Sequence, residues 1–164
     1  MSTRLLSESI VRERYPHLRY VRIHTSGRRT ATIYAWDDRL ELSEADRESL
    51  RKFAAAYLTP FVCFKVEPYG RIREEGIPAA PEVPECVSEA AMNRRLTLRG
   101  IAEVVDGMLA GGSMCFERYD QATATAYMAI SSERPISLVE RELLELYLGE
   151  LMPLGTRCEV RYTT

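Results

Sequence analysis

The sequence has few histidines and almost no lysine. Its 164 residues contain two histidines, His17 and His24, and two lysines, Lys52 and Lys65, against 20 arginines. A GC-rich genome favours arginine over lysine codons, so this bias alone indicates no function. The scarcity of histidine leaves few candidates for acid–base chemistry near neutral pH.

Long apolar runs and a strong net charge are also absent. No apolar run approaches the roughly 20 residues that a membrane-spanning helix needs, and charged residues interrupt the segment 1–8 too early for a signal peptide. The net charge is −2, which gives no overall attraction to nucleic acid or to an anionic membrane. We therefore expect a cytoplasmic protein with no membrane partner, and the acidic balance argues against nucleic acid as a partner.

Recognisable catalytic and metal-binding motifs are missing. The sequence contains no nucleophile elbow, phosphate-binding loop, HExxH or dinucleotide-binding motif. The four cysteines are far apart and form no CxxC pair, so we expect structural thiols and neither a zinc site nor a disulfide; they are Cys63, Cys86, Cys115 and Cys158. We predict no cofactor and no catalytic residue, although the sequence alone leaves an enzymatic activity open.

Two short motifs recur at a nearly constant separation. The segment 30–34 (TATIY) reappears at 123–127 (TATAY), with four of five residues identical. A second segment, 43–50, begins with serine and resembles the segment 137–144. The first pair of segments is separated by 93 residues and the second pair by 94. Both matches together, in the same order, indicate an internal repeat.

The repeat predicts an α+β fold, a tandem duplication of one αββαβ unit with antiparallel-rich sheets and helices on one face. We expect the first repeat over 1–67, a proline- and glycine-containing extended connector over 68–96, and the second repeat over 97–164. The first repeat should hold helices over 7–15 and from 43, and strands over 20–25, 29–36 and 61–67. The second should hold helices over 97–110 and from 137, and strands over 114–119, 122–130 and 156–163.

Capping signals mark the start of each central helix. Ser43 and Ser137 are each followed three residues later by an acidic residue, Asp46 or Glu140. The hydroxyl can accept from a free backbone N–H of the first turn, and the carboxylate adds favourable charge there. We therefore expect both helices to begin directly after these serines.

Alternation along the strands predicts one candidate surface in each repeat. Small apolar residues such as Ala31 and Ile33 should face the helices, whereas the residues between them should face the other way. The candidate ligand-binding or interface residues on this second face are Arg22, His24, Tyr34, Trp36, Tyr119 and Tyr127. Such a face could pack against the other repeat, be covered by a second chain, or form a ligand groove.

The helix expected from 138 to 152 carries more apolar residues than one buried stripe accommodates. Such a helix is either central in the fold or covered by another chain. We therefore predict a non-catalytic protein that acts through protein–protein association or self-assembly as a homo-oligomer. The alternative is a small-ligand sensor or enzyme with a pocket between the two repeats.

Overall fold

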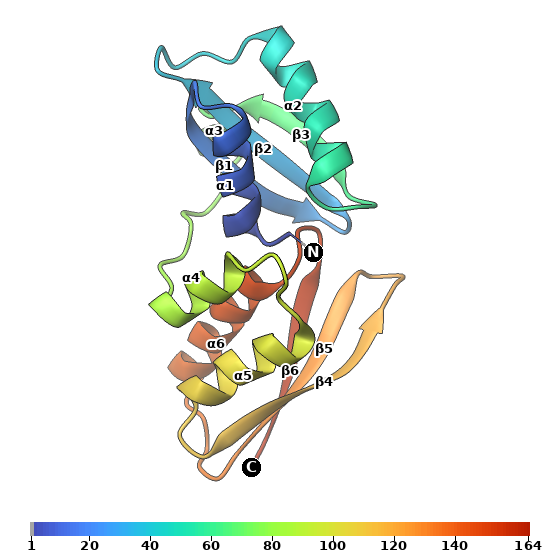
Figure 1. Ribbon diagram of the computed structural model, residues 1–164. Helices are drawn as coiled ribbons and strands as arrows, with labels where there is room; N and C mark the ends of the chain where they lie inside the picture. The colour runs from blue at the N-terminus through green and yellow to red at the C-terminus, as the bar shows by residue number, and fades with distance from the viewer. Residues whose placement is uncertain (1) are drawn as a thin grey trace. The chain divides into compact units, whose positions relative to one another are not determined.

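The computed structural model describes residues 2–164 and divides into two compact units. Unit 1 runs to Ala80 and also includes Pro153–Gly155, and unit 2 comprises Pro81–Met152 and Thr156–Thr164. The fold is α+β, with one three-stranded sheet in each unit (Figure 1). The boundaries predicted for the two repeats stay predictions, because the two units are defined by contacts within the structure and this division by itself gives no evidence of a duplication.

Apart from the short helices α3 and α4, the helices and strands follow the same order, αββαβ, in both units. Unit 1 contains α1 (Arg4–Arg14), β1 (Leu18–Gly27), β2 (Thr30–Asp37), α2 (Glu44–Tyr57), β3 (Cys63–Pro68) and α3 (Arg71–Glu74). Unit 2 contains α4 (Glu85–Ala91), α5 (Leu98–Met108), β4 (Gly112–Asp120), β5 (Thr125–Ser132), α6 (Leu138–Leu151) and β6 (Arg157–Thr163).

Both sheets are mixed and share one topology. The strand orders are β1-β2-β3 and β4-β5-β6, with the first pair of each antiparallel and the second parallel. The expected antiparallel-rich sheets are therefore only half antiparallel. The reason lies in the central helix, which carries the chain back along the sheet so that the third strand runs parallel to the second.

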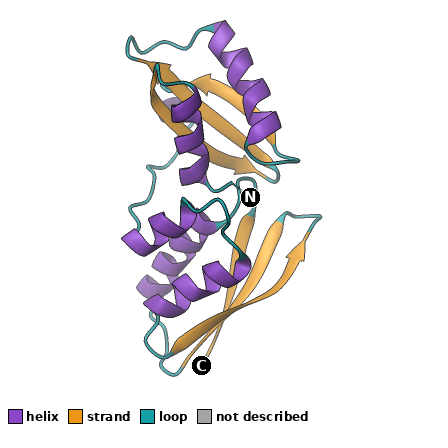
Figure 2. Cartoon of the chain, viewed as in Figure 1, coloured by secondary structure: helices purple, strands orange, loops and turns teal. Residues whose placement is uncertain are grey.

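The helix-facing side of sheet 1 forms the core of unit 1. Ala31, Ile33 and Ala35 of β2 are buried in one cluster with Leu50 and Ala54 of α2. The strand alternation therefore gives the core face of β2 correctly. Figure 2 shows α1 and α2 lying against the same side of this sheet.

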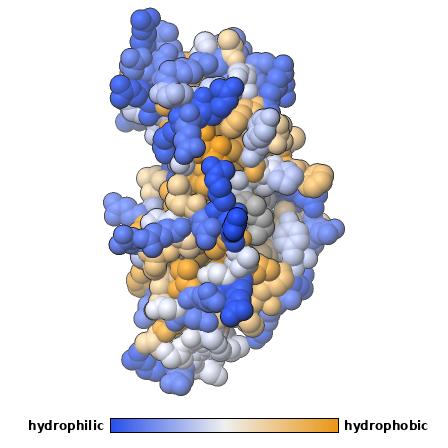
Figure 3. Space-filling model, viewed as in Figure 1, coloured by the Kyte–Doolittle hydropathy of each residue, from blue (hydrophilic) through white to orange (hydrophobic). Residues whose placement is uncertain are grey.

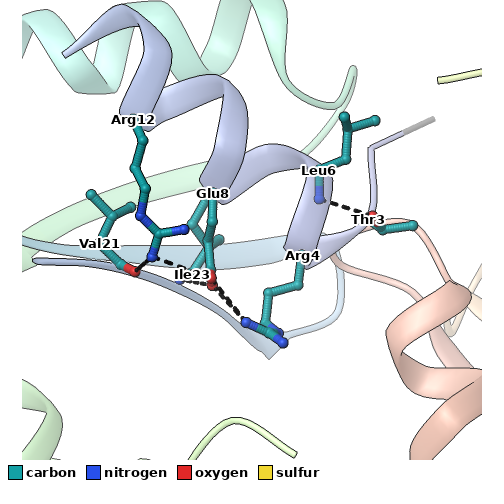
Figure 4. A network of polar contacts seen from close by, with 7 residues as sticks. All are labelled: Thr3, Arg4, Leu6, Glu8, Arg12, Val21 and Ile23. Carbon is teal, nitrogen blue, oxygen red and sulfur yellow. Dashed lines mark hydrogen bonds and ion pairs between the residues drawn. The ribbon is translucent and has the colours of Figure 1, made fainter. Parts of the chain in front are cut away.

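A carboxylate on α1 covers the open edge of β1 (Figure 4). The buried Glu8 accepts the backbone N–H of Ile23 at 2.9 Å and pairs with Arg4, also at 2.9 Å. One turn further on, Arg12 donates to the carbonyl of Val21 at 3.0 Å. Because a free strand edge can pair with another chain, these side chains protect unit 1 from edge-to-edge association.

Unit 2 packs its helices along one side of sheet 2 (Figure 2). Ala126, Met128 and Ile130 alternate along β5 and are buried. The buried helix residues are Ile101 and Val105 of α5 and Leu144, Leu148 and Leu151 of α6. Both predicted caps form: Ser43 and Ser137 each accept the N–H three residues on, and Glu140 completes a capping box on α6.

In both sheets, the residue before the second strand has a positive φ, and its carbonyl binds the first residue of the third strand. Arg29 and Ala124 both have positive φ, 52° and 51°, directly before the second strand. The Arg29 carbonyl accepts the N–H of Cys63 at 2.8 Å, and the Ala124 carbonyl accepts that of Arg157 at 2.9 Å. Cys63 and Arg157 are the first residues of the third strands.

This equivalence corrects the sequence alignment of the repeat by two residues. Thr30 and Thr125 are both the first residues of their strands, so Thr30 matches Thr125 and not Thr123. The offset is therefore 95 in these strands and 94 in the central helices. A shift of two preserves the face of every side chain, which is why the wrong alignment still gave the right core face.

The connector differs from the extended segment that its prolines predicted. It contains the short helices α3 and α4, and Val87 and Ala91 of α4 are buried. Pro84 lies at the start of α4, where a proline costs no hydrogen bond. Prolines therefore mark the ends of these helices and do not prevent them.

Candidate functional site

Four of the predicted site residues share the second face of sheet 1. Strand register places Tyr20 beside Trp36, Arg22 beside Tyr34, and His24 beside Thr32. The face is therefore an aromatic row at one end followed by two polar rows.

The chain's own connector covers the aromatic end of this face. Tyr69, directly after β3, lies 5.5 Å from the Tyr20 ring and 5.6 Å from the Trp36 ring between centroids. At Gly70 a Cβ atom would come within 2.7 Å of the Trp36 ring, so only glycine permits this approach. Tyr34 is only 1 % exposed and donates to Glu75 at 2.5 Å. The connector therefore covers this end of the face. The sequence pattern indicated only the other repeat or a second chain as covers.

The electrostatics of this face shift the pKa values of two of its side chains. Burial, together with the hydrogen bond to Glu75, raises the pKa of Tyr34 to about 12, so it stays protonated and acts as a donor. Burial and then the nearby Arg22 lower the pKa of His24, so it is uncharged near neutral pH. Among residues 2–164, no group of three or more His, Cys, Asp or Glu side chains could hold a metal ion.

The two predicted site residues of sheet 2 lie on opposite faces. Tyr127 carries the guanidinium of Arg118 over its ring at 3.9 Å. The candidate role of Tyr119 stays a prediction. By register, Tyr119, which is 43 % exposed, instead pairs with Ala126 and shares the face of that residue, not the face of Tyr127. The cause is a bulge between Phe116 and Arg118, because one extra residue reverses the alternation beyond it.

Four of the six predicted residues therefore lie in unit 1 and two in unit 2. A cavity of about 360 Å³ lies elsewhere, in unit 2, between the end of α5 and the start of α6. We call it the α5–α6 cavity; its lining residues are Met108, Leu109, Ala110, Ser132, Arg134, Pro135, Ile136, Glu140, Leu143, Leu144 and Tyr147. The lining is mostly apolar, with one cation and one carboxylate.

An apolar surface on α6 adjoins this cavity. Leu138, Val139, Leu143 and Leu146 are between 41 % and 76 % exposed, and Leu143 also lines the cavity. In Figure 3, apolar residues reach the surface over the helices of unit 2, between charged ones. The excess of apolar residues that the sequence showed in this helix is therefore left uncovered by the chain itself.

A second exposed apolar feature lies at the end of α2. Phe61 is 93 % exposed and has φ 62°, a left-handed conformation that is a rare outlier for a bulky residue. Tyr57, the last residue of α2, is 72 % exposed. The residue at the equivalent place before β6, 94 positions on, is Gly155, which has φ 78° and belongs to unit 1. The repeat offset could have revealed this contrast, but we applied it only to the matching motifs.

Comparisons with models of known families, with curated proteins and with solved structures give no match. Among residues 2–164, no helix combines the length and the apolar character that crossing a membrane requires. Any functional statement about this chain therefore rests on its own residues.

Proposed function

We propose that this protein is a non-catalytic cytoplasmic protein that associates with itself through the apolar surface of α6. The observation that supports this is the exposure of Leu138, Val139, Leu143 and Leu146 on one helix. Fully burying one such side chain stabilises a complex by roughly 1.5–3 kcal/mol before the costs of association. A contiguous exposed patch of this kind is typical of an interaction site.

We also propose that the two units arose by tandem duplication of an αββαβ unit. Their shared strand order and their equivalent strand starts support this origin. Duplication followed by divergence would explain why the apolar surface of α6 has no counterpart on α2, which carries exposed charged pairs such as Arg51–Glu48.

The molar mass in solution tests the proposed association. Light scattering behind size exclusion should give a mass that rises above one chain, 18.7 kDa, as the concentration increases. Leu146→Glu should shift the protein toward the monomer, whereas Leu98→Glu, at an exposed leucine of α5, should not. A wild-type protein that stays monomeric at its highest soluble concentration would contradict the proposal.

Small-ligand binding is a second candidate function. The α5–α6 cavity falls in the range of roughly 300–1,000 Å³ that ligand pockets occupy. Arg134 would favour a ligand with an apolar body and a carboxylate. Thermal-shift measurements with a panel of small carboxylic acids should then show stabilisation that Arg134→Gln removes, whereas no shift with any acid would exclude this class of ligand. A pocket between the two repeats stays a separate prediction.

A further inference from the structure

Phe61 combines backbone strain with almost complete exposure. Its φ of 62° is one that glycine adopts freely, and Gly155 takes the equivalent place before β6. Because the ring is 93 % exposed, unit 1 gains little packing from it. Packing within unit 1 therefore does not explain why this position carries a phenylalanine.

Tyr57 extends this feature into a small aromatic knob. It lies in the last turn of α2, four residues before Phe61, and its ring stacks on Phe53 with centroids 5.2 Å apart. We call Tyr57 and Phe61 the aromatic knob. Exposed aromatic residues on a defined backbone are typical anchors of protein interfaces.

The α5–α6 cavity has the chemistry to receive such a knob. Its walls include Met108, Leu109, Leu143 and Tyr147, and methionine and aromatic side chains make favourable contacts with a phenyl ring. Its volume of about 360 Å³ exceeds what a single ring requires. Leu143 also connects the cavity to the exposed surface of α6, so a seated ring would lie next to further apolar area.

The charges around the knob and the cavity are opposite in sign. Residues 51–65 contain three cations and no acidic residue, and they include both lysines of the chain. Glu48, just outside this range, pairs with Arg51 and offsets one of these charges. Residues 133–145, a range that leaves out the buried Glu150, contain four glutamates and two arginines. This complementarity favours contact between the two segments of different copies and disfavours contact of either segment with itself.

We propose that Phe61 of one copy inserts into the α5–α6 cavity of another copy, so that copies associate head to tail. This inference rests on the self-association proposed above and names the second surface that takes part. A head-to-tail contact uses two different surfaces, so it builds a ring or an open chain instead of stopping at a symmetric dimer.

Three variants separate the knob from the cavity. Phe61→Gly removes the ring and relieves the positive φ, and Leu143→Glu places a charge at the rim of the cavity. Leu40→Gly is the matched control, because Leu40 also has positive φ (60°) and is 53 % exposed. In analytical ultracentrifugation, the first two variants should each weaken association at least about tenfold, and the control should assemble like the wild type. Circular dichroism should show that all three are folded; Met108→Glu replaces Leu143→Glu if that variant unfolds.

Mixing the two variants gives the decisive measurement. The Phe61→Gly chain keeps its cavity and the Leu143→Glu chain keeps its knob, so an equimolar mixture should form a 1:1 complex with twice the mass of one chain. Failure of this complex to form, or a Phe61→Gly chain that assembles like the wild type, would overturn the inference. In the latter case, loss of assembly in Leu146→Glu would still support association through α6. A monomeric wild type would overturn both proposals.

Discussion

At the scale of single residues, the same left-handed backbone conformation recurs before the second and the third strand of both sheets. Arg29 and Ala124 have the same left-handed conformation directly before the second strand of their sheets. Phe61 and Gly155 have it two residues before the third strand, but one of them carries a large aromatic side chain and the other carries none. A non-glycine residue in this region costs of order 1–3 kcal/mol. The two positions therefore share one conformation, and only Gly155 is a residue that adopts it without strain.

Gly155→Ala should destabilise the protein by about 1–3 kcal/mol. The substitution adds the cost of a positive φ, and its Cβ would lie 3.0 Å from the Arg29 Cα and 3.2 Å from Val62. Gly149→Ala is the matched control: this glycine is within α6, and a Cβ there meets nothing within 4 Å. The control should stabilise by up to about 1 kcal/mol. Urea unfolding measures both, and equal effects of the two substitutions would show that Gly155 is not required for its conformation.

Cys158 should resist alkylation in the native protein between pH 7 and 9. Its thiol lies 3.8 Å from the Met128 sulfur, on the helix-facing side of β6. Burial, with smaller contributions from Glu145 and Glu159, raises its pKa to about 11, so the reactive thiolate is scarce below that pH. Cys63 is exposed and is the internal reference. Mass spectrometry after brief treatment with iodoacetamide should find Cys63 modified first; equal rates for the two cysteines would contradict this placement.

At the scale of elements, the two first strands differ in how their open edges are covered. Glu8 and Arg12 of α1 bind backbone groups in the middle of β1. On β4, Asp106 of α5 accepts the N–H of Met114, near the start of the strand, at 2.7 Å. The position of a helix over a strand edge depends on tertiary packing. Hydrophobic periodicity therefore predicted the helices, but it did not predict that their side chains would cover the edges of β1 and β4.

Glu8→Ala should destabilise unit 1 by about 3 kcal/mol. The substitution leaves the Ile23 N–H without its acceptor and removes the carboxylate that Arg4 contacts. Glu13→Ala, at an exposed position of the same helix, should change stability by less than about 0.5 kcal/mol. The fluorescence of Trp36, the one tryptophan of the chain, reports the unfolding of unit 1 in urea. A loss below about 1 kcal/mol for Glu8→Ala would mean that this network contributes little.

At the scale of the whole molecule, unit 1 is completed by residues far away in the sequence. Leu154 is buried in the core cluster of unit 1, and its N–H donates to the Ser2 carbonyl at 3.0 Å. The N–H of Gly155 donates to Thr25 Oγ1, also at 3.0 Å. The chain up to Ala80 therefore lacks part of its own core.

Leu154→Ala should lower the stability of unit 1 by about 2–4 kcal/mol, because it opens a cavity in that core. The midpoint of the Trp36 fluorescence transition in urea should fall accordingly. Leu138→Ala, at a leucine that is exposed on α6, should leave this transition unchanged. A fragment that ends at Ala80 should likewise unfold at lower urea concentration than the full chain; equal midpoints would show that Leu154 is dispensable.

The sequence by itself determined the local features of this protein. Serine followed by an acid three residues on set the starts of α2 and α6, because a cap depends only on neighbouring residues. Alternation set the buried face of β2, because successive side chains in a strand point to opposite sides. The repeated motifs indicated the common order of elements even with an alignment shifted by two residues.

Tertiary structure alone decided the remaining features. The bulge that places Tyr119 on the same face as Ala126 depends on how β4 pairs with β5. Trp36 and Tyr34 are covered because the connector lies against them. The prolines and glycines of the connector do not predict where it lies. The α5–α6 cavity joins residues from two helices and a loop, so no sequence window contains it. These features arise from contacts between distant segments, which local patterns in a single sequence do not encode.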